Sequence, residues 1–281
     1  MNNLAEKIDY APGIYQGIPA AEYHALPLIS NSYLKKLAKC PANAKVVDDT
    51  ETKALILGRA AHVMTLEGAM AFHAEFGVLP EGINLRTNAG KEALATFQAG
   101  NANKMILSAD DYGVITGIRQ SVQTHPFAKA LLQEGVSETT VIFDSTSGGH
   151  PIRCKCRPDR TPSVDMATLI DLKTTEDASY TAFLRSCVKY GYFTQAAFYV
   201  DGYNAVKPEA DPAMDTFVFI AVEKKPPFRC EVYTVDQELI TWGRGEYQRL
   251  LALEAECRRN NLWPHFTNAG ADDLLMPSWL K

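Results

Sequence analysis

The 281-residue sequence predicts a single α/β domain with a central mixed β-sheet flanked by helices, and three observations lead to this fold class. Apolar residues in the first half recur at helical spacing, which indicates helices. After residue 135 the sequence alternates or is rich in β-branched residues, which indicates strands. Two further strands and a last helix complete an order that is typical of α/β folds. We expect a mainly helical part over 1–135 that carries His62, a sheet core over 136–235, and a C-terminal helix and tail over 236–281.

The helices of the first half follow from caps and from apolar spacing. Ser30-Asn31-Ser32 offers N-cap residues to a short helix that ends near Pro41. Helices are also predicted over about 52–68, 92–100 and 110–125, and His62 is the polar exception in the first of these.

The second half alternates strands and helices. Strands over 139–143, 152–157 and 167–174 are predicted to form an antiparallel series, with Gly148-Gly149 and the loop 162–165 between them. One long helix is then predicted over 178–203, followed by strands over 217–222 and 228–234. An amphipathic helix over 237–260 completes the set.

Composition and charge exclude several classes of protein. Hydrophobic residues make up 46% of the chain, so a disordered chain is excluded. The net charge of −5 argues against a protein that coats nucleic acid or membranes through bulk charge, so any contact with a polyanion must be local. No apolar run is long enough to span a membrane, and we expect a cytoplasmic protein whose six cysteines are buried thiols.

The segment around Asp159, Asp171 and Lys173 is where the sequence points to chemistry. Residues two apart on a strand share a face, so Asp171 and Lys173 project together while Ile170 and Leu172 point into an apolar layer. The loop after Asp159 is long enough to return this carboxylate to the side of Asp171. Two adjacent carboxylates repel unless a cation lies between them, and hard oxygen ligands favour Mg²⁺ or Mn²⁺. This chemistry suits metal-assisted phosphodiester hydrolysis with Lys173 as a charge stabiliser, although Asp-x-Lys alone is usually an exposed ion pair.

Two helical motifs accompany these residues. Gly58-x-x-x-His62 places a glycine one turn before a histidine, so that another backbone or a substrate can approach the imidazole. Gln195-x-x-x-Tyr199 places an amide and a phenol on one helix face. Alone, His62 would be a buried core histidine, and Gln195 and Tyr199 would be helix-surface residues.

In this order, G-x-x-x-H, P-D, D-L-K and Q-x-x-x-Y resemble the motifs of the PDDEXK nuclease superfamily in its RecB-like form, which implies a restriction-endonuclease-like core. A closer resemblance is to the RecE (exonuclease VIII) nuclease domains, over about residues 12–279. It rests on Gly13-Ile14-Tyr15, Ser30-Asn31-Ser32, Leu34, Arg157-Pro158-Asp159 and Met276-Pro277-Ser278-Trp279. The long N-terminal region of RecE is missing here, so we expect a stand-alone phage or prophage version.

The resemblance implies a role for each matching residue. His62, Asp159, Asp171 and the backbone carbonyl of Leu172 would hold Mg²⁺, with Mn²⁺ as a substitute. Lys173 would be the catalytic lysine, and Gln195 and Tyr199 would orient the substrate or support the site. In the wider superfamily a Glu often fills the position of Asp171, so the shorter side chain must lie nearer the metal or reach it through water.

The resemblance also implies an activity and partners. The protein would be a Mg²⁺-dependent exonuclease that digests linear double-stranded DNA 5′ to 3′ and leaves single strands for a RecT-like annealing protein in recombination. It would form a ring tetramer. Two alternatives stay open: a RecB-like nuclease of a CRISPR-adaptation or repair system, and a non-catalytic DNA-binding relative.

A basic row precedes Asp159. Arg153, Lys155 and Arg157 share one face of their strand, and we expect them to contact DNA phosphates beside the metal site, helped by Lys35, Lys36, Lys39 and Lys224-Lys225. The alternative is that these are ordinary solvated side chains.

Overall fold

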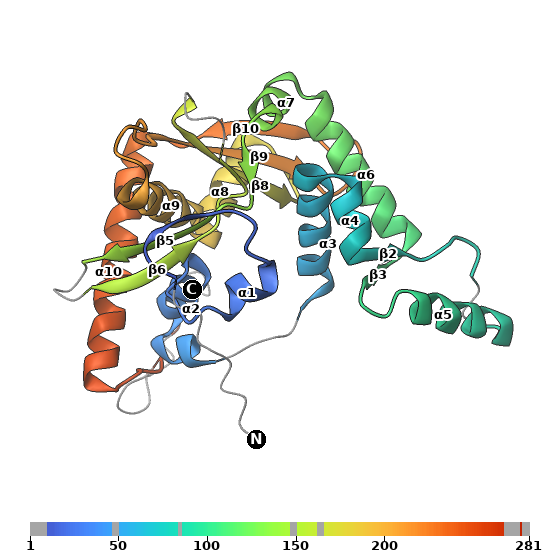
Figure 1. Cartoon of the computed structure of the whole chain (residues 1–281), viewed down its shortest axis with the longest axis horizontal. Helices are drawn as coiled ribbons and strands as arrows, with labels where there is room; N and C mark the ends of the chain where they lie inside the picture. Colours follow the sequence, from blue (N-terminus) through green and yellow to red (C-terminus); the bar gives the residue numbers. More distant parts are fainter. Residues whose placement is uncertain are drawn as a thin grey trace.

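The computed structural model of the protein describes residues 10–46, 51–83, 86–146, 151–161, 166–266 and 276 (Figure 1). Gly148-Gly149, the loop 162–165 and residues 277–279 of the C-terminal motif lie outside the described residues. Within the part of the chain that is described, no helix combines the length and the apolar character needed to cross a bilayer.

A five-stranded mixed sheet forms the centre of the molecule, in the order β10-β9-β8-β7-β4. Its strands are β4 (Val136–Ser137), β7 (Arg160–Thr161), β8 (Thr168–Thr175), β9 (Thr216–Glu223) and β10 (Cys230–Thr234). Strand β8 pairs parallel with β9, and the other neighbours pair antiparallel. The predicted mixed sheet is confirmed.

A separate three-stranded antiparallel sheet has the order β1-β5-β6, with β1 over Gly13–Tyr15, β5 over Thr140–Ser145 and β6 over Ile152–Cys156. The prediction that the strands over 139–174 form one antiparallel series is therefore wrong. Pro158, two residues after the end of β6, has no N–H to donate to a ladder, so the β5–β6 pairing does not continue and the chain crosses to the central sheet.

Helices dominate the first half, as predicted. They are α1 (Ala20–Ala25), α2 (Asn31–Lys39), a 3₁₀ turn (Pro41–Lys45), α3 (Lys53–His62), α4 (Ala69–Glu75), α5 (Asn88–Gly100), α6 (Ala109–Thr124) and α7 (Pro126–Gln133). The Ser30 side chain caps α2 by accepting from the N–H of Tyr33. The helix predicted over 52–68 changes after His62 into a π-helical turn over Val63–Glu67. With α5, strands β2 (Phe76–Val78) and β3 (Met105–Leu107) form an arm that projects from the body (Figure 1).

The long helix predicted over 178–203 is two helices, α8 (Tyr180–Tyr190) and α9 (Tyr192–Val206). Gly191 separates them with a left-handed backbone, φ +64°, which a glycine adopts without strain. Helix α10 (Gln237–Asn260) is capped by the Asp236 carboxylate and has the predicted bounds.

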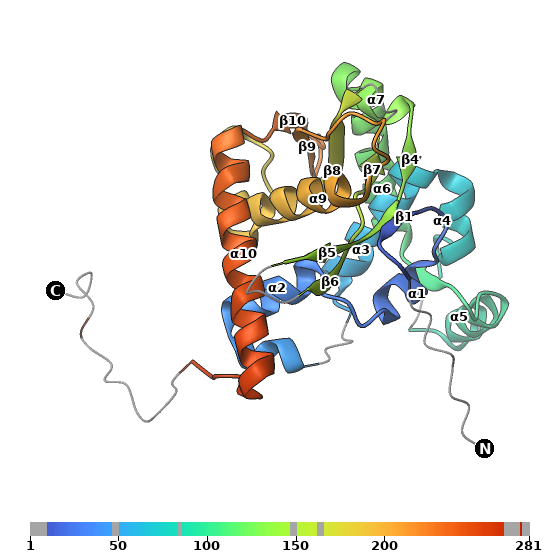
Figure 2. The same cartoon turned by 60° about the vertical axis from the view of Figure 1, so that its left-hand side comes forward.

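Two apolar cores lie on opposite faces of the central sheet. One contains Leu169, Phe217 and Phe219 and is covered by α2, α8, α9 and α10. The other contains Ile170 and Leu172 and is covered by α3, α4, α6 and α7 (Figure 2). All six cysteines are buried thiols, as predicted.

Candidate active site

Asp159 and Asp171 come together at neighbouring strands of the central sheet. Asp159 directly precedes β7, which pairs antiparallel with β8 through Arg160 and Ile170. Oδ2 of Asp159 accepts a hydrogen bond of 2.7 Å from the backbone N–H of Leu172, the residue after Asp171. The geometric prediction that the chain returns Asp159 to the side of the Asp171 strand is confirmed.

Asp171 and Lys173 share one face of β8, opposite the core that holds Ile170 and Leu172. Nζ of Lys173 forms an ion pair with Oδ2 of Asp171, and their side chains are only 16% and 2% exposed. Because the pair is buried, the alternative of a solvent-facing ion pair is wrong.

Helix α9 brings Gln195 to the same carboxylate. Nε2 of Gln195 donates a hydrogen bond of 2.6 Å to Oδ1 of Asp171, and both groups are buried. Tyr199, one turn further, is also buried, and its ring lies 6.3 Å from that of Phe217. Neither motif residue is a helix-surface residue. The structure joins Gln195 to Asp171 and places Tyr199 in the core behind it.

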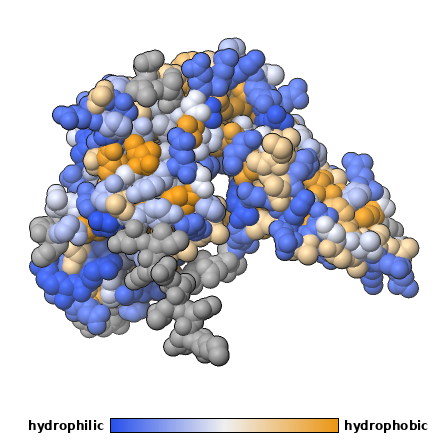
Figure 3. Space-filling model, in the orientation of Figure 1, coloured by the Kyte–Doolittle hydropathy of each residue, from blue (hydrophilic) through white to orange (hydrophobic). Residues whose placement is uncertain are grey.

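His62 reaches the carboxylates from the other side, as the last residue of α3. Its Nδ1 lies 3.2 Å from Oδ2 of Asp159, and its side chain is 25% exposed. Helix α3 borders a hollow on the face shown in Figure 3. Gly58 is not required by close packing, because an added Cβ would meet only Oγ1 of Thr174, at 3.9 Å.

Glu138 is a member of the site that the sequence prediction missed. One ligand atom from each of His62, Glu138 and Asp159 lies within 4.8 Å of the other two. Glu138 occupies the corner between β4 and β5, where its φ is +55° and its N–H donates to the carbonyl of Asp159 at 3.1 Å. This unusual backbone conformation turns the chain so that the carboxylate faces His62.

The pKa values of the site show how strongly these groups interact. Burial opposes the charge of Asp159, but His62, Lys173 and the Leu172 N–H outweigh it and lower the pKa of Asp159. Burial would lower the pKa of His62, yet the carboxylate of Asp159 more than compensates and raises it. The pKa of Glu138 is raised to about 8, first by burial and then by Asp159.

Burial and Asp159 also raise the pKa of Asp171 to about 6, although Lys173 and His62 oppose them. The pKa of Lys173 is raised because its two carboxylate neighbours outweigh burial, so its ammonium stays charged. At neutral pH the raised pKa of Glu138 keeps a proton in the site, which offsets the crowding of three carboxyl groups, and a bound cation can take the place of that proton.

The residues present fit a hard divalent cation. The donors are carboxylates with one imidazole, a set that suits Mg²⁺ or Mn²⁺ better than soft metals. Oε1 of Gln195 is buried without a hydrogen-bond partner among the described residues, and Oδ2 of Asp171 has only its ion pair. Asp171 does not belong to the group formed by His62, Glu138 and Asp159, so its role as a ligand, like that of the Leu172 carbonyl, stays a prediction.

Arg153 and Lys155 of the basic row share one face of β6 as predicted and Arg157 directly follows the strand, but the N-terminal segment covers that face. Lys155 is 4% exposed, and its ammonium donates to the carbonyls of Tyr23 at 2.5 Å and Leu26 at 2.8 Å. The prediction that Lys155 contacts DNA is wrong. Arg153 pairs with Asp144 and donates to the carbonyl of Tyr10.

Arg157 is also engaged within the chain. Its guanidinium donates to Oγ1 of Thr140 and to the carbonyl of Ile18, and it lies 4.2 Å from the ring centroid of Tyr23. The row therefore fixes the N-terminal segment against the sheet, and contact of Arg153 or Arg157 with DNA stays a prediction.

Comparison with known proteins places this geometry in a family. Residues 30–271 match the family model described as "PDDEXK-like domain of unknown function (DUF3799)". The crystal structure of a "Putative exonuclease" from Eubacterium rectale superposes with a TM-score of 0.55 at 14% identity, over 86% of this chain and 88% of that one. The solved structure of SSO0001 covers 81% and 87% at 13% identity, but with a TM-score of only 0.30. No curated protein matches the sequence. Since the family model spans most of the chain and the Eubacterium rectale structure shares its fold, the chain belongs to the PDDEXK-like family.

Proposed function

We propose that the protein is a divalent-metal-dependent nuclease that hydrolyses phosphodiester bonds of DNA. The observation that carries this proposal is the meeting of His62, Glu138 and Asp159 beside the buried Asp171–Lys173 pair, inside a PDDEXK-like fold. The name of the Eubacterium rectale protein agrees with this activity.

The residues divide the work of hydrolysis between them. A cation held by His62, Glu138 and Asp159, with Asp171 nearby, would acidify a water molecule and neutralise charge on the phosphate. Lys173 keeps its proton because of its carboxylate neighbours, so it presents a fixed positive charge where negative charge grows in the transition state. Gln195 holds Asp171 through Oδ1, which fixes the orientation of that carboxylate.

The finer activity rests on the resemblance to RecE-type nucleases. We propose Mg²⁺ as the natural ion with Mn²⁺ as a substitute, linear double-stranded DNA as substrate, and 5′ to 3′ digestion that supplies single strands to a RecT-like annealing protein. A ring tetramer around the DNA and a phage or prophage origin belong to the same proposal.

Cleavage assays test the proposal directly. The protein is incubated with Mg²⁺ and either end-labelled linear duplex, covalently closed circular duplex, or single strands. We expect loss of the linear duplex only, abolished by EDTA and by Lys173→Ala. The matched control is Lys129→Ala, an exposed lysine on α7 that should cleave like wild type. Cutting of the closed circle would replace the exonuclease by an endonuclease, and binding without cutting would leave a non-catalytic relative.

A further inference from the structure

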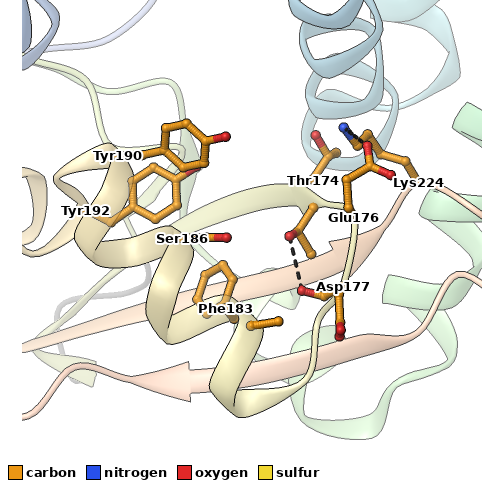
Figure 4. Close-up of a pocket in the computed structure, with 10 residues that line it drawn as sticks. Thr174, Glu176, Asp177, Phe183, Ser186, Tyr190, Tyr192 and Lys224 are labelled. Atoms are coloured by element: carbon orange, nitrogen blue, oxygen red, sulfur yellow. Dashed lines mark hydrogen bonds and ion pairs between the residues drawn. The ribbon is translucent and has the colours of Figure 1, made fainter. Parts of the chain in front are cut away.

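A cavity of about 220 Å³ opens beside Lys173, at the C-terminal end of β8. In Figure 4, Tyr190 and Tyr192 lie on one side of it and Glu176, Asp177 and Lys224 on the other. The ring of Tyr192 connects the cavity to the candidate active site, because Nζ of Lys173 lies 4.7 Å from its centroid. The cavity is thus next to the position where a phosphodiester would react.

The two tyrosines form an aromatic wall of the cavity: Tyr190 is exposed, whereas Tyr192 is half-buried and packs against Phe219 at the edge of the core. The left-handed turn at Gly191 places them at the bend between α8 and α9, with ring centroids 5.8 Å apart and planes 31° apart. Tyr190 is 48% exposed. Such large aromatic surfaces beside a cavity are common in sites that stack flat ligands.

Three lysines surround these rings. Lys35 lies 5.2 Å from the centroid of Tyr192, Lys189 lies 5.2 Å from that of Tyr190, and Lys173 approaches Tyr192 from the active site. Among the described residues, no ion pair involves Lys35 or Lys189. Aromatic rings with cations around them are the combination that binds single-stranded nucleic acid, where the rings stack bases and the cations contact phosphates.

The opposite wall decides which part of a nucleotide the cavity can take. The carboxylate of Glu176 pairs with Lys224 at 2.6 Å and with Lys225 at 3.3 Å, and Asp177 accepts from the N–H of Ser179. The two lysines balance the carboxylates of Glu176 and Asp177, so this wall offers a phosphate no surplus positive charge. A neutral aromatic group with polar edges needs no such charge and can use the hydroxyls of Thr174 and Ser186.

We infer that this cavity binds the base of an unpaired nucleotide next to the phosphodiester held at Asp159, Asp171 and Lys173, with Tyr190 and Tyr192 stacking on the base. The inference rests on the proposed nuclease function and assigns it a base-binding subsite. It implies that the terminal base pair opens before the strand is cut.

Tyr190 is the residue to change, because it is exposed and does not contact the reacting groups. The probe is a hairpin DNA with one open end in three versions: intact, with three abasic nucleotides at its 5′ terminus, or with three at its 3′ terminus. Binding is measured in EDTA, so that cleavage does not interfere. We expect Tyr190→Ala to weaken binding of the intact hairpin about tenfold, within the range known for base stacking. Tyr190→Phe keeps the ring and should bind like wild type.

Wild type and Tyr190→Ala should bind one of the two abasic hairpins equally weakly, namely the hairpin that lacks the base expected to stack on Tyr190. The matched control is Tyr180→Ala on the same helix, 67% exposed and outside the cavity, which should change nothing. Equal binding of all three hairpins by wild type and Tyr190→Ala would overturn the inference, as would an undiminished Tyr190→Ala defect on both abasic versions. In both cases wild-type cleavage would leave the nuclease proposal standing. A wild-type protein that neither binds nor cuts DNA would overturn both proposals.

Discussion

Replacing Glu138 by glutamine should stabilise the metal-free protein and weaken its response to metal. Glutamine keeps the shape of the side chain but cannot ionise, so it removes the cost of burying a charge and the repulsion with Asp159, which in that order raise the pKa of Glu138. The side chain of Glu138 thus destabilises the metal-free protein and also belongs to the candidate metal site. A residue with a purely structural role would not show these two opposite effects together.

The magnitude follows from linkage between the pKa and the free energy of unfolding. A carboxyl whose pKa rises from 4.5 in the unfolded chain to about 8 in the folded protein binds its proton more tightly when folded. Stability is therefore lost as the pH rises above 4.5, and the loss levels off above pH 8. At pH 7 it reaches about 3 kcal/mol as an upper bound, from about 1.4 kcal/mol for each pKa unit. Glu138→Gln recovers at most this amount, or roughly 6 °C in melting temperature.

Thermal unfolding in EDTA and during titration with Mg²⁺ or Mn²⁺ gives both readouts, and calorimetry gives the Mn²⁺ affinity. We expect Glu138→Gln to melt higher than wild type in EDTA and to bind Mn²⁺ about tenfold more weakly or worse, as the loss of even an outer partner of a metal site can cause. Glu134→Gln, an exposed change four residues earlier, is the control and should match wild type. Equal melting in EDTA together with unchanged Mn²⁺ affinity would refute the assignment of Glu138 to the site.

Three further predictions concern the fold and the pH response. Gly243→Ala should destabilise the protein by about 3 kcal/mol, because its Cβ would lie 2.2 Å from the backbone oxygen of Phe193. Gly245→Ala on the same helix is the control: its Cβ meets nothing within 4 Å, and it should stabilise the protein by about 1 kcal/mol. Urea unfolding measures both changes in stability. Lys155→Met should cost about 1–3 kcal/mol, since it removes the hydrogen bonds of a charged, buried ammonium to the carbonyls of Tyr23 and Leu26, while a salt titration of DNA binding stays unchanged. Without metal, unfolding experiments should show stability falling as the pH rises towards 6, because the pKa of Asp171 is raised from 3.8 to about 6, and saturating metal should flatten this slope.

The parts of the fold that could be predicted are those with a strong local signal. The alternation of β8 placed Asp171 and Lys173 on one face because the side chains of a strand alternate regardless of what packs on it. Helix α10 carries its own Asp236 cap and ends at Asn261 in a left-handed conformation, so its bounds could be predicted from the sequence.

The parts that were missed depend on contacts between distant segments. Glu138 lies in the corner between β4 and β5 and belongs to no sequence motif and no periodic pattern of residues. Only the tertiary fold brings it close to His62. In the sequence, a single glutamate beside a β-branched run looks like an ordinary charge at the end of a strand. Glu223, which follows such a run, looks the same as Glu138, which precedes one. The available signal was weak: a carboxylate near the start of a strand that leads towards Asp159.

The basic row on β6 shows a different limit. Strand parity predicts which residues share a face, but it does not say whether water or another segment covers that face. Here the carbonyls of Tyr23 and Leu26 cover it and take the hydrogen bonds of Lys155, while Arg157 donates to Ile18. The lysines that remain available near the site are instead on helices, around Tyr190 and Tyr192.

This arrangement explains how an acidic chain with a net charge of −5 can act on a polyanion. The carboxylates gather at the side of Asp171 that faces His62, where they need a cation before a phosphate can approach. Lys173 lies at the boundary, paired with Asp171 on one side and beside the Tyr192 ring on the other. DNA phosphates would therefore meet negative charge at the metal site, where a metal ion can compensate it, and the positive charges of Lys35 and Lys189 along the aromatic wall. For this molecule the distribution of charge, rather than its sum, decides whether DNA can bind.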